Sequence, residues 1–355
     1  MLKRSPCALC VLLVGLALGF PMFGASAQTF DSFKLNFLGG ITNLPQTTVI
    51  ERPTIEGLPK KSNGRIDVRY RTFQELGLQG PELLRLATRR SFDVVYLLGG
   101  YASGDAPFLV GADLPGISPT LEEAKEQANA FRPALAKFLE EQFSITPLTV
   151  WPYPHQYLYC REPVGSLDQL GGKRVRVHSS ALATLVKNLG ASALTMPIGD
   201  VYSALQRGVI DCATNSSVAG NAMKWFEVST TMVDLPLGWA MNVHLANKGF
   251  WDGLEPGARS FLQDQMKTME AAFWDMARER GEDALNCNTG QECKAHTKAA
   301  MKLYRLTAAE NTRVREVVSR AVLPEWAGVC SQKFPACVPE WNRTVGRVAG
   351  VTIKQ

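Results

Sequence analysis

The sequence contains few of the residues from which catalytic and metal-dependent sites are commonly built. Four histidines, at positions 155, 178, 244 and 296, occur in 355 residues, and none lies in the H-E-x-x-H spacing that binds zinc on a helix. A G-x-S-x-G nucleophile turn, a P-loop and a G-x-G-x-x-G turn after a strand are also missing. An enzyme is therefore not indicated, and we expect no cofactor and no bound metal.

Blocks of like charge are absent as well. The 38 lysines and arginines and the 33 acidic residues are interspersed, so binding to nucleic acid or to an anionic membrane surface is not indicated. We find no internal repeat and no low-complexity tract.

Long apolar stretches are missing beyond the N-terminus. Lys3 and Arg4 precede an apolar run from Cys7 to about Phe20, and Ala25-Ser26-Ala27 follows as a cleavage signal. This pattern predicts a secretory signal peptide that is cleaved after Ala27, and hence export to the periplasm. Removal of 27 of the 355 residues leaves 328 and lowers the net charge from +5 to +3. That length fits two α/β lobes or one large domain.

Six cysteines remain after cleavage, at positions 160, 212, 287, 293, 330 and 337. In an oxidising compartment an even number favours disulfides, although six cysteines permit 15 pairings. Cys287 with Cys293 and Cys330 with Cys337 would close short local loops, and by elimination Cys160 would pair with Cys212. A zinc site would need closer cysteine spacing and nearby histidines.

Strand-like and helix-like segments alternate along the mature chain. We expect strands at Phe33–Gly39, Arg65–Tyr70 and Phe92–Leu98, and helices at Pro45–Lys61, Pro81–Arg89, Leu121–Gln142, Ala181–Leu189 and from Pro256 to about Asn286. Thr120 is a candidate cap for the helix that follows it, and Ser180 for the helix at Ala181. The alternation predicts an α/β fold with a parallel sheet covered on both faces.

One short strand carries a candidate anion ligand. In Lys173–His178, Val175 and Val177 alternate with Arg174, Arg176 and His178, so the two sets lie on opposite faces. An arginine at the end of a half-buried strand is costly unless an anion meets it, and its rigid donor fork suits a carboxylate. Arg176 is therefore the candidate.

Several segments match a known family in sequence and order. They read S-L-D-Q-L-G-G-K-R-V-R-V from Ser166, L-G-A from Leu189, M-P from Met196, V-Y-S-A-L-Q-R-G-V-I-D from Val201, and N-K-G-F-W-D-G-L from Asn247. These segments resemble the periplasmic solute-binding proteins of TRAP transporters, in the dicarboxylate-binding (DctP-type) family. The A-L-Q-R-G-V-I-D stretch is specific, because a helix end, a turn glycine and a strand must fall in fixed register.

The resemblance implies a two-lobed periplasmic-binding-protein fold with crossover strands and a long helix that spans both lobes. The expected division is 28–150 with 240–285 for lobe I, and 151–239 with 286–355 for lobe II and a C-terminal extension. The implied function is that of a monomeric extracytoplasmic receptor, which binds a small organic acid by its carboxylate and delivers it to a TRAP-type membrane transporter when the cleft closes.

The resemblance also places candidate ligand-binding residues. Arg176 would bind the carboxylate, and Asn215 matches the asparagine of the family's motif after the A-L-Q segment. Trp239 lies where the family's chain crosses back between lobes. The remaining candidates are Gln156 or Tyr157 at a second anion position, Tyr101 after two glycines, and His178 on the face of Arg176.

The sequence departs from the family at points that bear on the ligand. Asp200 replaces the usual glutamate, and C-A-T-N-S from Cys212 replaces G-x-E-N-P. The family's arginine upstream of K-P-I is missing in the stretch from His155 to Val164, so a monocarboxylate is expected rather than a dicarboxylate. The alternatives are a secreted hydrolase or lyase that uses Cys212 and His155, and a receptor of another transporter class.

Overall fold

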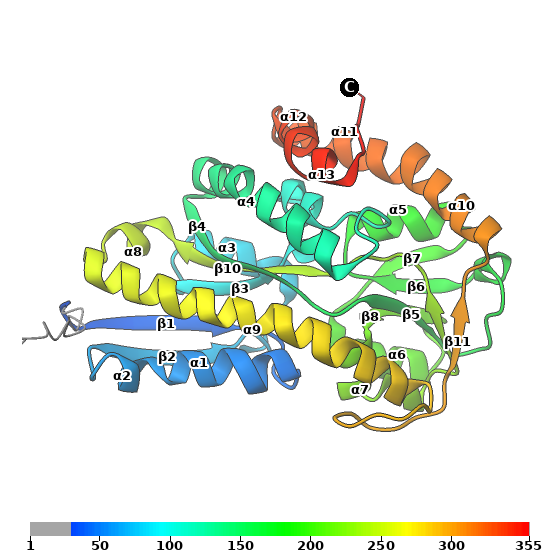
Figure 1. The fold of residues 1–355 in the computed structure, drawn as a ribbon, viewed down its shortest axis with the longest axis horizontal. Helices are drawn as coiled ribbons and strands as arrows, with labels where there is room; N and C mark the ends of the chain where they lie inside the picture. The colour runs from blue at the N-terminus through cyan, green and yellow to red at the C-terminus, as the bar shows by residue number, and fades with distance from the viewer. Residues whose placement is uncertain (1–29, 355) are drawn as a thin grey trace, which may run out of the picture.

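The computed structural model describes residues 30–354, and the predicted signal peptide lies outside the described residues. The chain forms two lobes, each built on one β-sheet with helices packed around it (Figure 1). We name the lobe with the five-stranded sheet the first lobe and the lobe with the six-stranded sheet the second lobe.

The sheet of the first lobe has four strands that run in one direction and one strand that runs antiparallel to them. Its order is β2 (Ile66–Thr72), β1 (Phe33–Gly39), β3 (Val94–Leu98), β10 (Met241–Asn247) and β4 (Ile145–Pro152). Strand β1 is parallel to β2 and β3, whereas β10 is antiparallel to β3 and β4. All five residues of β3 are buried, which agrees with its continuous apolar sequence and its place inside the sheet.

The sheet of the second lobe has the order β11 (Lys302–Arg305), β9 (Thr231–Asp234), β5 (Gln156–Cys160), β8 (Cys212–Ser216), β6 (Arg174–Val177) and β7 (Ser192–Thr195). Strands β6, β7 and β8 run parallel, and β5 is antiparallel to both β8 and β9. The strand predicted around Arg176 is therefore an inner strand of this sheet.

The chain passes between the lobes more than once. It crosses from β4 to β5, returns from β9 to β10, and crosses again along α9 (Pro256–Asn288). This helix has 33 residues, about 50 Å at 1.5 Å per residue, and packs on β4 in the first lobe and on α7 (Ser217–Ala222) in the second (Figure 1). The predicted crossover strands and the helix that spans both lobes are confirmed.

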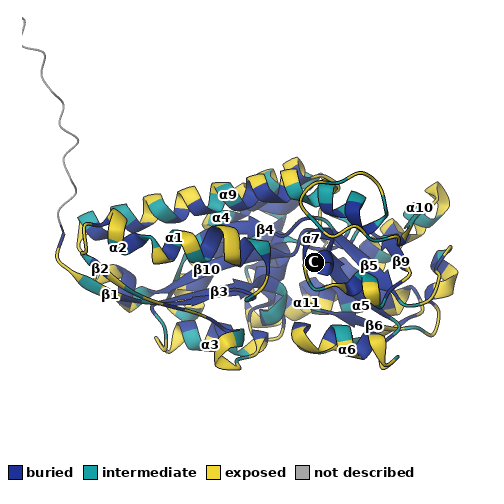
Figure 2. Ribbon diagram, turned by 90° about the horizontal axis from the view of Figure 1, so that it is seen from below, coloured by how far each residue is buried: buried dark blue, intermediate teal, exposed yellow. Residues whose placement is uncertain are grey.

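The remaining helices cover the sheets, and their exposed faces point outward (Figure 2). In the first lobe they are α1 (Arg52–Glu56), α2 (Leu58–Lys61), α3 (Leu83–Thr88), α4 (Leu121–Phe143) and α8 (Lys248–Asp252). In the second lobe they are α5 (Ser180–Asn188), α6 (Val201–Gln206) and α10 (Ala308–Val317).

Two helix starts test the predicted caps. The Thr120 hydroxyl accepts a hydrogen bond from the Glu123 N–H, and the Glu123 side chain bonds back to Thr120, which forms a capping box at the start of α4. For α5 the predicted cap, Ser180, is wrong by one residue. Ser179 accepts the hydrogen bond from Leu182 N–H, because Ser180 already lies in the helix.

The C-terminal segment lies across both lobes. After β11 and α10, the turn η9 (Val318–Val322) and α11 (Leu323–Lys333) contact α5 of the second lobe. Helix α11 also packs on η5 (Pro107–Ala112), and η10 (Asn342–Gly346) and α13 (Arg347–Ala349) pack on α4 of the first lobe (Figure 1). The segment 286–355, expected to form part of lobe II and a C-terminal extension, thus contacts the first lobe as well, because helix faces after residue 322 are buried against it.

Three disulfides join the six cysteines in the predicted pairs. Cys160 lies directly opposite Cys212 in the antiparallel pair β5–β8, with their Cα atoms 4.1 Å apart. Cys287 bonds to Cys293, and Cys330 in α11 bonds to Cys337 in α12 (Cys337–Trp341). The bond between strands ties two distant segments of the second sheet together, while the other two close short loops.

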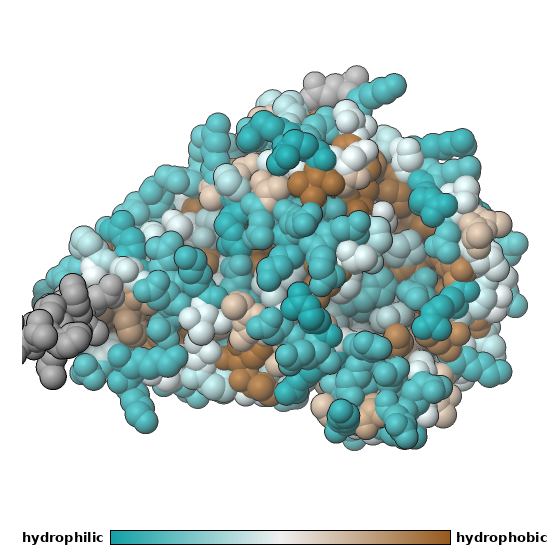
Figure 3. Space-filling view, in the orientation of Figure 1, coloured by the Kyte–Doolittle hydropathy of each residue, from teal (hydrophilic) through white to brown (hydrophobic). Residues whose placement is uncertain are grey.

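Hydrophilic residues dominate the face of the molecule that Figure 3 shows, and hydrophobic residues are scattered between them. Within residues 30–354, no helix combines the length and the apolar character that a membrane span needs.

Candidate functional site

A cavity of about 780 Å³ lies between the two lobes. The first lobe lines it with residues that follow β2 and β3, and the second lobe lines it with residues that follow β6 and β7. In both sheets these positions are the carboxyl ends of parallel strands, the usual location of ligand sites in open α/β sheets. The volume suits a small molecule.

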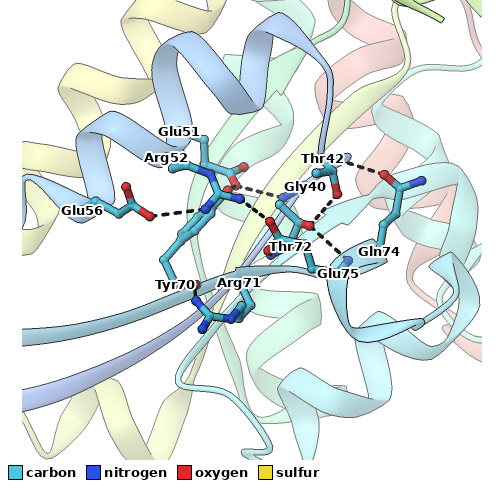
Figure 4. A network of polar contacts seen from close by, with 10 residues as sticks. All are labelled: Gly40, Thr42, Glu51, Arg52, Glu56, Tyr70, Arg71, Thr72, Gln74 and Glu75. Atoms are coloured by element: carbon cyan, nitrogen blue, oxygen red, sulfur yellow. Dashed lines mark hydrogen bonds and ion pairs between the residues drawn. The ribbon is translucent and has the colours of Figure 1, made fainter.

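A polar network holds the first-lobe wall in place (Figure 4). Gln74 lines the cavity, and its Oε1 accepts a hydrogen bond of 2.9 Å from the Thr42 N–H. The hydroxyls of Thr42 and Thr72 lie 2.6 Å apart, and the Thr72 N–H donates to Glu75 at 2.9 Å. The turn η2 (Gln74–Leu76) is thereby fixed to the loop after β1.

The buried carboxylate of Glu51 anchors the other side of this network. Glu51 Oε1 accepts hydrogen bonds from the Tyr70 hydroxyl at 2.5 Å and from the Gly40 N–H at 2.8 Å (Figure 4). Its Oε2 lies 3.1 Å from Nε2 of the buried His244. Because each oxygen of this carboxylate has a partner, the burial of its charge is compensated within the first lobe.

Arg176 in β6 is the strongest candidate ligand contact on the second-lobe wall. The side chain is only 2% exposed, and it lines both the large cavity and a smaller inner pocket of about 20 Å³. Its Nε donates to the Met196 carbonyl at 3.3 Å and its Nη1 to the Thr214 carbonyl at 3.4 Å. Both bonds are long, and the guanidinium has five N–H donors.

The charge of Arg176 has no acidic partner among the described residues. Its neighbour Arg174, two residues earlier in the strand, is exposed and pairs with Asp211 at 2.8 Å. Burial lowers the pKa of Arg176, and the Tyr101 hydroxyl opposes that effect. A buried cation without a carboxylate costs several kcal/mol, so the site is suited to an incoming anion.

Tyr101 and His178 also line both cavities. They come from opposite lobes, because Tyr101 follows β3 and His178 follows β6. Burial raises the pKa of Tyr101, and the Arg176 charge partly offsets this rise. Burial, followed by the charge of Arg176, lowers the pKa of His178 to about 3. His178 is therefore a neutral imidazole near pH 7.

The inner pocket brings Gln156 and Asn215 to the same place. Both residues line it together with Arg176. Gln156 begins β5 and lies opposite Ser216, the last residue of β8. The Gln156 amide nitrogen donates to the Pro154 carbonyl at 3.0 Å. Asn215 Nδ2 contacts Met223 Sδ at 4.0 Å, and its Oδ1 accepts a hydrogen bond from the Ser216 N–H.

Tyr157 and Trp239 do not lie among the residues that line either cavity. Tyr157 follows Gln156 in a strand and so points to the opposite face of the sheet, where it meets the His155 ring edge-on. The Trp239 indole N–H donates to the Ser118 carbonyl, and its backbone N–H donates to Asp113. Both aromatic rings pack in the crossover region, away from the cavity.

The two lobes touch at the mouth of the site. A Cβ placed on Gly100 would lie 2.8 Å from His178 Nδ1, 2.9 Å from the His178 carbonyl oxygen and 3.0 Å from Ser179 Cβ. The Ser180 N–H also donates to the Ser103 hydroxyl at 3.3 Å across the same boundary. The first-lobe loop after β3 therefore packs directly on the second-lobe segment that follows Arg176.

Several lining residues were not among the predicted site residues. They are the first-lobe segment from Phe73 to Pro81, the second-lobe segment from Thr195 to Asp200, and Thr214. The second segment contains Met196-Pro197, which match the family, and Asp200, which replaces the family's glutamate, so the resemblance could have marked this segment. For Thr214 the sequence offered no signal, because the β6–β8 register pairs Arg176 with Ala213 and strand alternation then assigns Thr214 to the other face.

Among the described residues, Asp283, Cys287 and His296 form a group with metal-ligand atoms close together. Cys287 is bonded to Cys293, so it offers no thiolate to a metal. Asp283 is instead occupied by the N–H groups of Lys294 and Ala295 and by the His296 ring. This group organises the loop after α9.

The chain is similar in sequence to known solute-binding proteins. Residues 56–327 match the family described as bacterial extracellular solute-binding protein, family 7. The ectoine-binding periplasmic protein TeaA of Halomonas elongata is 26% identical over 159 residues, which cover 44% of this chain and 45% of that protein. The C4-dicarboxylate-binding periplasmic protein DctP of Rhodobacter capsulatus is 28% identical over 210 residues, which cover 58% and 60%. The chain thus spans about half the length of the curated relatives it matches.

Solved structures share the fold over nearly the whole chain. A TRAP periplasmic solute-binding protein from Desulfovibrio salexigens with bound orotic acid superposes with a TM-score of 0.77 at 18% identity, covering 90% of this chain and 100% of that one. A Bordetella pertussis extracytoplasmic solute receptor that binds pyroglutamic acid gives 0.78 at 19% identity, covering 89% and 100%. With the family match over most of the described residues, the chain belongs to the bacterial extracellular solute-binding proteins of family 7.

Proposed function

We propose that this protein is a periplasmic receptor that binds a small organic acid between its lobes and delivers it to a TRAP-type membrane transporter. Arg176 binds the carboxylate, and residues from both lobes enclose the rest of the ligand. One observation carries the proposal: Arg176 is a buried cation without an acidic partner among the described residues, at the wall of a cavity between two lobes. The signal peptide is cleaved after Ala27, and the mature protein acts as a monomer.

The energetics require more than this one contact. A charge-assisted hydrogen bond contributes roughly 1.5–3 kcal/mol, so a two-point contact gives about 3–6 kcal/mol. Micromolar binding needs about 8 kcal/mol. The apolar residues of the cavity, among them Phe73, Leu78 and Ile198, supply the balance by enclosing the body of the ligand.

Enclosure requires the lobes to come together around the ligand. Because the cavity is lined from both sides, a ligand that touches both lobes only in the closed arrangement shifts the equilibrium toward that arrangement. Gly100 and Ser103 of the first lobe meet His178 and Ser180 of the second. These contacts form the seam along which the lobes close.

The ligand is a monocarboxylate rather than a dicarboxylate. Among the described residues that line the large cavity, Arg176 is the one lysine or arginine, and the two acids, Asp105 and Asp200, are exposed at its edge. A second ligand carboxylate would therefore meet no cation and would face acidic side chains. Tighter binding of a dicarboxylate than of its monoacid analogue would contradict this assignment.

The enzymatic alternative has less support. It needs Cys212 as a free thiolate, whereas Cys212 is buried and bonded to Cys160. His155, the other member of that pair, lies 3.1 Å from Asp234 outside the cavity lining. Neither side chain is available as a nucleophile or base toward a ligand in the cavity.

A thermal-shift screen of organic acids on the mature protein tests the proposed function. Wild type is screened beside Arg176→Met, which removes the charge and keeps a long side chain, and Arg174→Met, which removes an exposed arginine from the same strand. We expect one or more monocarboxylates to raise the melting temperature of wild type and Arg174→Met and to leave Arg176→Met unchanged. An equal shift in all three proteins would place the anion site elsewhere.

A further inference from the structure

The half-buried His178 has ring nitrogens that combine burial with an unusual lack of partners. The residue follows the end of β6, two positions after Arg176, and lines both the large cavity and the inner pocket. Both ring nitrogens are buried, and neither has a hydrogen-bond partner. A buried polar atom without a partner costs about 1–3 kcal/mol, so these two atoms are conspicuous in a well-packed interior.

Thr214, which lines the same inner pocket, adds a third unpartnered polar atom. Thr214 is fully buried, and its hydroxyl has no hydrogen-bond partner. Thr214 also supplies the carbonyl that accepts the 3.4 Å bond from Arg176 Nη1. His178 and Thr214 thus line the inner pocket together with Arg176, and both carry side-chain polar atoms without a partner.

The chemistry of His178 limits what it can bind. The imidazole is neutral near pH 7, so it offers one N–H donor and one acceptor nitrogen but no charge. It therefore suits a hydroxyl, a keto oxygen or a ring amide better than a second carboxylate. Arg176 and His178 line the same small inner pocket, so the two side chains lie close together. A carboxylate on Arg176 can thus hold its neighbouring carbon within reach of the imidazole.

We propose that His178 is a specificity-determining residue that exchanges a hydrogen bond with a polar group beside the ligand carboxylate. The ligand class is then 2-substituted monocarboxylic acids that carry a hydroxyl, a keto group or a ring amide at this position. This assignment rests on the proposed carboxylate contact at Arg176. It adds a second recognition element that distinguishes among acids which all satisfy Arg176.

Matched pairs of acids test this assignment by titration calorimetry. The pairs are lactate with propionate, mandelate with phenylacetate, and pyroglutamate with cyclopentanecarboxylate. In each pair the second acid keeps the carboxylate and the shape but lacks the polar group. The quantity measured is the ratio of the two dissociation constants, for wild type, His178→Leu, His178→Phe and His178→Gln.

In wild type we expect the substituted acid of at least one pair to bind about tenfold or more tightly than its partner, because a site built for a hydrogen bond rejects an analogue that lacks it. The ratio falls to near one in His178→Leu, while the unsubstituted acid keeps its affinity. His178→Phe repeats the test if the leucine variant fails to fold. His178→Gln, which keeps a donor and an acceptor, restores part of the preference.

The outcomes separate the two proposals. An unchanged ratio in the leucine and phenylalanine variants, or equal binding of both acids of every pair by wild type, overturns the role of His178 and leaves the receptor function standing. Binding that survives in Arg176→Met overturns the carboxylate contact on which this assignment rests. Failure of every acid to bind folded wild type overturns the receptor function and this inference together.

Discussion

Replacement of Gly100 by alanine is predicted to weaken ligand binding by holding the lobes apart. The added methyl group would lie 2.8 Å from His178 Nδ1 and 2.9 Å from the His178 carbonyl oxygen. Both atoms belong to the opposite lobe, and one of them is backbone. Gly100 does not adopt a positive φ, so alanine brings no backbone strain and acts only through the space that it occupies.

The size of the effect follows from the cost of overpacking. An extra methyl group in a filled contact costs about 1–3 kcal/mol. Separation of the lobes relieves this cost, so the substitution disfavours the closed state by that amount. At 1.4 kcal/mol per tenfold change, ligand affinity falls by about 5- to 140-fold. The free energy of unfolding changes little, because the open arrangement contains no clash.

Titration calorimetry with an acid that binds wild type measures the change, and Gly104→Ala is the matched control. Gly104 lies in the same loop and lines the same cavity, but no atom lies within 4 Å of a Cβ placed on it. We expect Gly104→Ala to bind like wild type and Gly100→Ala to bind more weakly, with similar melting temperatures for both unliganded variants. Wild-type affinity in Gly100→Ala would refute the closing seam.

Three further predictions concern stability. Arg176→Met should raise the unfolding free energy of the unliganded protein by about 1–4 kcal/mol in urea titrations, because it removes an unpaired buried charge; a loss of stability would show that the charge is compensated. Burial raises the pKa of Asp113 to about 7, although the carboxyl group accepts hydrogen bonds from the N–H groups of Trp239 and Met241. The protonated Asp113 therefore contributes fully to the free energy of unfolding below pH 3.8, and this contribution is lost as pH rises through 7. Wild type should therefore lose up to about 4 kcal/mol relative to Asp113→Asn between pH 4 and pH 7, and parallel pH profiles would contradict the assignment. Thr120→Ala should cost about 1 kcal/mol in chemical denaturation through loss of the α4 cap, and an unchanged midpoint would mean that the capping box contributes nothing.

Local sequence patterns were sufficient to predict those features that depend on which face of a strand or helix is buried. The alternation around Arg176 predicted a strand with Arg176 and His178 on one face, and both line the same cavities. Compartment and spacing predicted the disulfides, of which the Cys160–Cys212 bond joins directly opposed strand positions. The strand face depends on residues that are close in sequence, and the disulfide pairs follow from the number and spacing of the cysteines, so both could be predicted from the sequence alone.

Features that depend on how distant segments pack together could not be predicted from local sequence patterns. The sequence could not decide between Gln156 and Tyr157, because both faces of β5 are buried. The folded arrangement has Gln156, and not Tyr157, in the lining of the inner pocket. Trp239 could have faced the cavity, but its indole N–H is taken by the Ser118 carbonyl. The approach of Gly100 to His178 joins two lobes, and no local pattern encodes it.

The C-terminal segment illustrates the same limit. The sequence predicted a C-terminal extension but not the surface on which it packs, and its helices after residue 322 contact α4 and η5 of the first lobe. The indole N–H groups of Trp326 and Trp341 donate to the carbonyls of Pro107 and Gly111 in η5. No pattern in the sequence predicted these contacts, because only the folded arrangement brings the two segments together.

The most direct test of carboxylate recognition at Arg176 is a calorimetric titration of the best-binding acid into wild type, Arg176→Met and Arg174→Met at one pH and salt concentration. We predict equal dissociation constants for wild type and Arg174→Met, and no measurable heat of binding for a folded Arg176→Met. Retained affinity in Arg176→Met would contradict the central claim, because the ligand would then be held without the buried cation.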